Sequence, residues 1–218
     1  MEAPSEQPQP QDGDRLPELP PHAFAKQDGG DDLAFYAAPR LVTHIDEAAV
    51  EALSDFYRTS LPDGGRLLDL MSSWVSHLPQ DRSYAEVVGH GMNAEELAAN
   101  PRLSRWFVQD LNRTPALPLD DASFDGALCC VGAQYLQRPV TVFREVRRTL
   151  TTGAPFIVSF SNRCFPTKAV AIWRALDTRG HASLVRLYLE RAGFGEVTAK
   201  LLKDGRDSDP LVAVVGRG

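Results

Sequence analysis

The chain has 218 residues, 43% of them hydrophobic and 24% charged, which is typical of one globular domain. Its formal net charge of −6 argues against nucleic-acid binding through bulk electrostatics, and no apolar run approaches the roughly 20 residues of a membrane span. The three cysteines, Cys129, Cys130 and Cys164, lack zinc-ligand spacing. The acidic, proline-rich N-terminal stretch is unlike a signal peptide. We therefore expect reduced thiols, no metal site, no membrane or nucleic-acid partner, and a cytoplasmic protein.

The amino-acid composition of the first third of the chain changes near residue 31. Residues 1–31 are rich in Pro, Gln, Asp and Gly and predict a flexible tail, of which the portion Leu16–Phe24 could dock on the body. From Phe35 to Leu61 the spacing predicts a helix whose apolar stripe is Leu41, Ile45, Ala49, Leu53 and Phe56. We divide the chain into a tail (1–31), an N-terminal helical cap (32–62) and an α/β domain (63–218).

Strand-like and helix-like segments alternate after the turn Pro62–Gly65. Strands are predicted at Arg66–Leu70, Ala85–Gly89, Arg105–Gln109, Asp125–Val131, Pro155–Phe160, Glu196–Leu202 and Leu211–Gly216. Helices are predicted after a capping box at Asn93–Glu96 and at Thr141–Leu150, Thr167–Leu176 and Leu184–Ala192. This order predicts a doubly wound, Rossmann-like sheet of seven strands, mostly parallel, with the last two pairing antiparallel at its edge.

Ligands of such sheets bind beyond the carboxyl ends of the strands. The candidate residues after the first three strands are Asp69, Met71, Ser72, Ser73, then Gly91, Met92, Asn93, then Asp110, Leu111. A carboxylate can accept a hydrogen bond from an amine, and small hydroxyl residues allow a ligand to approach the backbone closely. The alternatives are a polar turn with an N-cap serine at the first site, helix capping by Asn93 at the second, and a solvated turn acid at the third.

Further candidates flank these positions. Gln134 and Tyr135 follow the fourth strand, where a second substrate would meet a cofactor, and Asn162 and Arg163 lie in the polar loop after the fifth strand. Tyr36, Arg40 and His44 precede the first strand. Arg40 and His44 are four residues apart, so on a helix they would share one face, as a lid or as a solvated surface. His44, His77 and Tyr135 are the candidate proton acceptors for an acceptor that must lose a proton.

Four segments carry a resemblance to a known family: Leu67–Leu70, Phe107–Asp110, Leu117–Asp125 and Arg144–Gly153. The pattern LP-x-x-x-x-SFD followed by RE-x-x-R-x-L-x-x-G is the most specific. Together they resemble class I S-adenosylmethionine-dependent methyltransferases of the type 11 kind, over about residues 60–216. The strings DLMSSWVSHLP, GHGMN-x-EEL and SFSNRCFPTKA are similar to a divergent branch of that family.

The resemblance implies S-adenosylmethionine as cofactor and assigns roles to particular positions. Asp69 matches the acid that ends the first strand, and Asp110 matches the acid near the adenine. Gly91 stands where the family has its ribose-binding acid. Met71, Ser73 and Val75 stand where it has three glycines.

The expected function is methyl transfer to an unidentified, small-molecule acceptor, because short insertions favour a small acceptor over a large polymer. No Asn/Asp-Pro-Pro-aromatic motif follows the fourth strand, which argues against amino-group methylation of nucleic acid bases or glutamine. The alternative is a degenerate methyltransferase-like binding or regulatory protein without catalysis. An NAD-dependent oxidoreductase is disfavoured because the first turn lacks G-x-G-x-x-G. The oligomeric state stays open.

Overall fold

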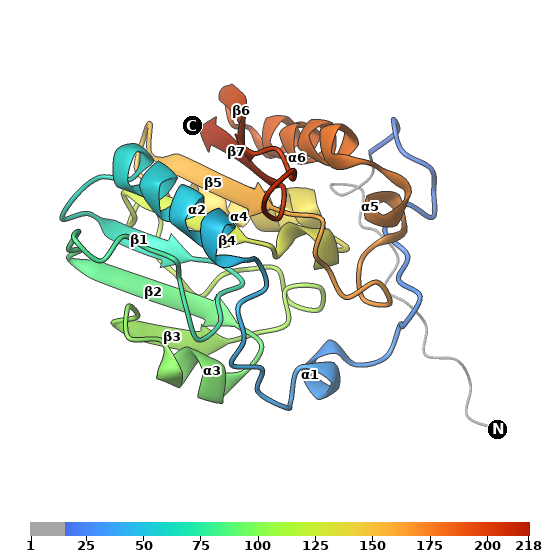
Figure 1. Ribbon diagram of the computed structural model, residues 1–218. Helices are drawn as coiled ribbons and strands as arrows, with labels where there is room; N and C mark the ends of the chain where they lie inside the picture. Colours follow the sequence, from blue (N-terminus) through green and yellow to red (C-terminus); the bar gives the residue numbers. More distant parts are fainter. Residues whose placement is uncertain (1–15) are drawn as a thin grey trace.

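The computed structural model describes residues 16–218, and its centre is one seven-stranded sheet (Figure 1). Residues 1–15 of the predicted tail lie outside the described residues. The strand order is β3-β2-β1-β4-β5-β7-β6. The strands are β1 (Arg66–Asp69), β2 (Glu86–Gly91), β3 (Arg105–Val108), β4 (Gly126–Cys130), β5 (Pro155–Phe160), β6 (Glu196–Lys203) and β7 (Leu211–Arg217).

The pairing confirms the predicted doubly wound topology. β1 lies between β2 and β4 and is parallel to both, β2 pairs in parallel with β3, and β4 with β5. β7 runs antiparallel to both β5 and β6. The carboxyl ends of β1 to β5 consequently meet at one edge of the sheet, on the right in Figure 1.

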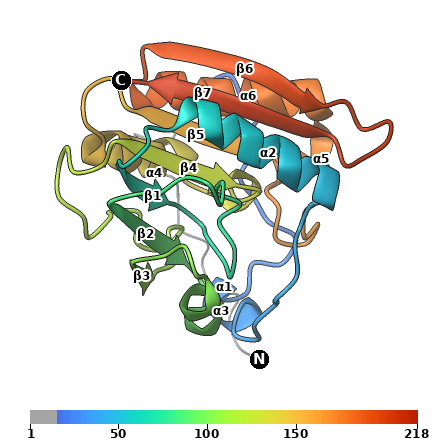
Figure 2. The same ribbon diagram turned by 60° about the vertical axis from the view of Figure 1, so that its left-hand side comes forward.

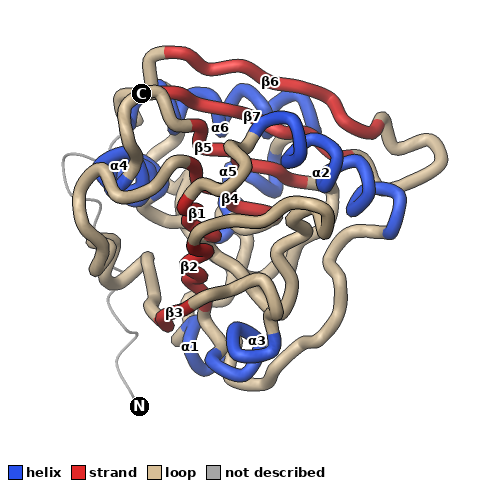
Figure 3. Tube along the Cα trace, turned by 90° about the vertical axis from the view of Figure 1, so that its left-hand side faces the viewer, coloured by secondary structure: helices blue, strands red, loops and turns tan. Residues whose placement is uncertain are grey.

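Helices cover the two faces of the sheet unequally (Figures 2 and 3). On one face lies α2 (Glu47–Ser60), which buries Leu53 and Tyr57 against Leu67 and Leu128 of the sheet. The other face carries α4 (Pro139–Thr149), α5 (Ala171–Ala175) and α6 (Thr178–Ala192). The short helices α1 (Asp32–Phe35) and α3 (Ala94–Ala99) and the 3-10 turn η2 (Ala133–Tyr135) lie near the carboxyl ends of the strands.

The predicted continuous helix from Phe35 to Leu61 is wrong, because an extended loop at residues 36–46 separates α1 from α2. Pro39 disfavours helical conformation in the residue before it. Asp46 then starts α2 by accepting a hydrogen bond from the Ala49 N–H at 2.9 Å. Leu41 is consequently 56% exposed instead of lying on a buried stripe. Arg40 and His44 do not share a helical face, since neither is in a helix.

Two other helix boundaries differ from the prediction. The helix expected from residue 167 begins only at Ala171. The helix expected from Leu184 begins six residues earlier at Thr178, because Asp177 accepts from the Gly180 N–H and caps it.

Residues 16–31 of the predicted tail lie against the body. Leu16 and Ala23 are buried, and the carbonyls of Ala23 and Ala25 accept hydrogen bonds from the first residues of α5. No helix within residues 16–218 is long and apolar enough to cross a lipid bilayer.

Candidate functional site

A cavity of about 350 Å³ lies beyond the carboxyl ends of β1 to β4 and is closed on one side by the loop 36–46. This volume lies in the range of small-molecule sites, roughly 300–1,000 Å³. Most of the predicted site residues line it: Tyr36, Arg40, His44, Asp69, Met71, Ser72, Ser73, Gly91, Met92, Asn93, Asp110, Leu111, Tyr135 and Arg163. Gln134 and Asn162 do not.

Asp69 is the most unusual charge in the cavity wall. Its side chain is 2% exposed, and Ser72 Oγ donates to its carboxylate at 2.6 Å. No lysine or arginine within residues 16–218 forms an ion pair with it. Burial therefore raises the pKa of Asp69 to about 7, against the lowering effect of hydrogen bonds from Ser72 and Ser76. A positively charged group of a ligand would supply the counter-charge that the protein lacks.

The turn after β1 contains no glycine and is not followed by a helix. Residues 70–85 contain no helix, and Met71 has φ of 56°, a left-handed conformation that favours glycine. The Met71 N–H donates to His90 Nδ1 at 3.2 Å, and the Ser72 N–H donates to the His90 carbonyl at 2.6 Å. His90 is thus the residue that holds this turn.

His90 can do this only as a neutral imidazole. Burial lowers the pKa of His90 to about 4, so the ring is uncharged at neutral pH. With Nδ1 accepting from Met71, Nε2 carries the proton and donates to the Gln109 carbonyl at 2.9 Å. One side chain therefore connects the ends of β1, β2 and β3.

Gly91 has no room for a side chain. A Cβ at this position would lie 2.5 Å from the Ser72 carbonyl oxygen and 3.0 Å from Leu97 Cδ2. The backbone of the first turn thus covers the end of β2. A ribose-binding acid cannot stand at Gly91 without displacing that turn.

Asn93 is committed to capping. Its Oδ1 accepts from the N–H groups of Glu95 and Glu96, and its Nδ2 donates to the carbonyls of Tyr36 and Ala37 at 2.9 and 3.0 Å. The same amide therefore starts α3 and anchors the loop over the cavity. The capping alternative accounts for all of these contacts.

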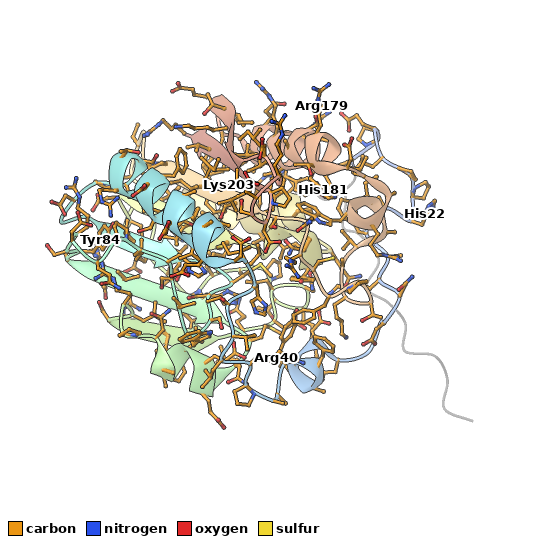
Figure 4. All side chains as sticks on the ribbon, in the orientation of Figure 1. His22, Arg40, Tyr84, Arg179, His181 and Lys203 are labelled. Carbon is orange, nitrogen blue, oxygen red and sulfur yellow. The ribbon has the colours of Figure 1, made fainter. Side chains whose placement is uncertain are left out.

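Glu96 does not close the capping box that the sequence predicts. Instead its Oε2 accepts from Ser73 Oγ at 2.6 Å and its Oε1 accepts from the Arg40 backbone N–H at 2.7 Å. Arg40 lies between α1 and α3 in Figure 4. Glu96 thus joins the first turn to the loop above it, a role with no local sequence signal.

Buried ion pairs fix the segment that leads into this loop. Lys168 is 1% exposed and contacts Asp28 and Asp32, each at 3.0 Å. Lys26 Nζ lies 2.5 Å from Asp32, which also accepts from Asn112 Nδ2 at 3.2 Å. These paired charges hold residues 26–32 against the loops after β3 and β5.

Tyr135 has a structural contact that the sequence did not reveal. Its hydroxyl accepts from the Phe165 N–H at 2.9 Å, and burial raises its pKa to about 12. The phenol thus keeps its proton at neutral pH, which makes it a poor proton acceptor. The preceding residue, Gln134, is buried and donates to the Val131 carbonyl, supporting a backbone with φ of 44° at Val131.

The loop after β5 places its residues differently. Asn162 is exposed and accepts from Ser161 Oγ, so it points away from the cavity. Arg163 lines the cavity but is paired with Asp209 at 3.0 Å. Phe165 also lines the cavity, although its sequence context carries no signal for such a role.

Comparisons with known proteins agree with this architecture. A family model described as a methyltransferase domain matches residues 72–158. The biotin biosynthesis bifunctional protein BioHC of Teredinibacter turnerae is 26% identical over 134 residues, which are 56% of this chain; the chain spans 23% of that relative's length.

Solved structures share the fold at low identity. An S-adenosylmethionine-dependent methyltransferase from Mesorhizobium loti is 18% identical with a TM-score of 0.52, covering 77% of this chain and 98% of the other. A possible histamine N-methyltransferase from Thermotoga maritima is 19% identical with a TM-score of 0.54, covering 78% and 90%. The [4+2]-cyclase SpnF is 15% identical with a TM-score of 0.59, covering 85% and 90%.

The methyltransferase domain model matches part of the chain, residues 72–158, and the solved structures share its fold. Both findings agree with the resemblance to S-adenosylmethionine-dependent methyltransferases that the sequence shows. The similarity to a cyclase shows that the fold alone does not determine the reaction.

Proposed function

We propose that this chain binds S-adenosylmethionine in the cavity and transfers its methyl group to a small-molecule acceptor. The observation that carries the proposal is Asp69, a carboxylate buried in the cavity wall without a cationic partner in the described chain. The methyl donor carries an ammonium and a sulfonium, and an ammonium placed at Asp69 would satisfy this carboxylate.

A second part of the wall fits the adenine of the donor. Asp110 and the backbone N–H of Leu111 border the cavity at the end of β3, where an adenine amine and ring nitrogen would find an acceptor and a donor. A carbon added at Gly132 would lie 2.8 Å from Met71 Cβ, so the turn after β1 packs directly against the backbone after β4. The protein's main task is to align donor and acceptor and exclude water.

The small size of the acceptor is supported by the cover over the site. The loop 36–46 lies beside the cavity and is held by Asn93 and Glu96 through contacts of 2.7–3.0 Å. A polymeric acceptor would have to displace this loop. A small molecule would need only the space of a site of this volume.

Isothermal calorimetry with S-adenosylmethionine and S-adenosylhomocysteine tests the proposal. We expect micromolar binding that weakens at least about tenfold in Asp69→Asn, since an ion pair with a buried carboxylate is lost. The control is Asp81→Asn, which removes a surface carboxylate paired with Arg58 and should not change binding. Absence of binding at millimolar ligand would refute the proposal and leave a non-catalytic binding or regulatory protein.

A further inference from the structure

One part of the cavity wall is built differently from the rest, and we call it the acceptor side: His44, His77, Tyr36, Tyr135 and Phe165. The Phe165 ring lies 5.7 Å from His44, 6.1 Å from Tyr135 and 6.2 Å from Tyr36, between ring centroids. Such spacing is that of aromatic rings in contact. The acceptor side therefore offers ring faces and edges to a ligand.

The ring nitrogens of the two histidines on the acceptor side form no hydrogen bonds within the described residues. Neither His44 nor His77 forms a side-chain hydrogen bond with any residue between 16 and 218, although both are only partly exposed and line the cavity. His77 is also held at φ of 55°, a conformation that is strained for a residue other than glycine. The ring nitrogens of both residues are therefore free to form hydrogen bonds with a ligand in the cavity.

Both imidazoles are neutral at pH 7. Burial lowers the pKa of His44, and the charged groups that act on it are Glu96, which opposes this effect, and Arg40, which adds to it. Burial, with a contribution from His44, lowers the pKa of His77 to about 4. A neutral imidazole has one N–H and one lone pair, so each ring can donate one hydrogen bond and accept another or take up a proton.

The charges near the acceptor side disfavour a cationic acceptor. Two carboxylates line the cavity near these rings, but both already have partners: Asp32 is paired with Lys26 and Lys168, and Glu96 accepts hydrogen bonds from Ser73 Oγ and the Arg40 N–H. Arg163 also lines the cavity and is paired with Asp209. The guanidinium of Arg40 lies 4.8 Å from the centroid of Phe35 and 5.3 Å from that of Phe165. It already occupies the faces that would otherwise attract a ligand ammonium, and its own charge would repel one.

We infer that the acceptor is a planar ring compound that carries an acidic hydroxyl, a phenol or enol, with His44 as the proton acceptor and His77 as the residue that positions the hydroxyl. This inference rests on the proposed function. In the step, the acceptor O–H proton passes to a ring nitrogen of His44 while the oxygen lone pair forms a bond to the methyl carbon. The carbon–sulfur bond breaks with its electron pair on sulfur, which gives a methyl ether, S-adenosylhomocysteine and one proton.

The test measures binding of matched probes to protein saturated with S-adenosylhomocysteine. The probes are 4-nitrophenol, 4-nitroaniline, which lacks the acidic hydroxyl, and 4-nitrobenzylamine, which is cationic. At a pH about one unit below the pKa of 4-nitrophenol, where the free probe is mostly neutral, we expect it to bind at least tenfold more tightly than either, with the absorbance band of its ionised form increasing on binding. His44→Gln should remove that increase, His77→Gln should weaken binding, and His22→Gln should change neither, because His22 lies at the outer edge of the molecule (Figure 4).

Selectivity in the unmodified protein decides the outcome even if a histidine variant fails to fold. If the protein binds S-adenosylhomocysteine but holds the three probes equally, or none of them, the inference is overturned while the proposed function stands. If the amine binds most tightly, the acceptor side serves a cation and the inference is likewise overturned. If S-adenosylhomocysteine itself does not bind, the proposed function fails, and the inference fails with it.

Discussion

Asp69 should make the stability of the ligand-free protein fall as the pH rises from about 4 to about 7. Its pKa is 3.8 in its ordinary state and about 7 in the folded protein. The folded state therefore binds more protons than the unfolded state across this window, and deprotonation on the way to pH 7 destabilises it. At about 1.4 kcal/mol per pH unit the full effect is about 4 kcal/mol. Asp69→Asn removes the charge, so the variant should become more stable than the parent as the pH rises.

The assay compares the melting temperatures of the parent and Asp69→Asn between pH 4.5 and 8. For a chain of this size, about 4 kcal/mol corresponds to about 10 °C, so the difference should be small at pH 4.5 and reach about 10 °C above pH 7. Other titrating groups are present in both proteins and cancel in the difference. S-Adenosylhomocysteine should reduce the difference at pH 8, because its ammonium stabilises the ionised carboxylate only in the parent. A difference that is constant with pH would refute the reasoning.

Two substitutions test the geometry around the cavity. Gly132→Ala should lower the free energy of unfolding in urea by about 1–3 kcal/mol and weaken donor binding, because the new Cβ would lie 2.8 Å from Met71 Cβ; unchanged stability would show that Met71 can move aside. Lys168→Met should cost about 3–5 kcal/mol and speed proteolysis within residues 26–46, because it leaves Asp32 paired only with Lys26; unchanged proteolysis would show that these ion pairs do not anchor the segment.

The sheet could be predicted because its signals are local. The buried strand β4 follows from a continuous apolar run, and the antiparallel pairing of β6 with β7 follows from two strands around a polar loop. The helix around Leu41 could not be predicted correctly, because its apolar spacing continues through residues that fold as a loop. The competing signals, Pro39 and the cap Asp46, are single residues within a helix-like pattern.

The lining of the cavity could be predicted where the rule of strand ends applies, as at Asp69 and Asp110. It could not be predicted where a residue acts through a distant partner. Glu96 contacts the backbone of Arg40, 56 residues away, and the Phe165 N–H meets Tyr135, 30 residues away. No spacing within either segment encodes such contacts, because they depend on how the loops meet after the sheet has formed.

The unusual first turn is held in place by His90, which does what a following helix would otherwise do. A helix after β1 would hold the turn through its own hydrogen bonds, and residues 70–85 contain none. Here the N–H groups of Met71 and Ser72 are both bonded to His90, through its Nδ1 and its carbonyl. The turn is therefore fixed without glycine and without a helix, and it keeps Asp69 and Ser72 together at the cavity wall. The absence of glycines from this turn thus changes how Asp69 is supported and does not remove the acid.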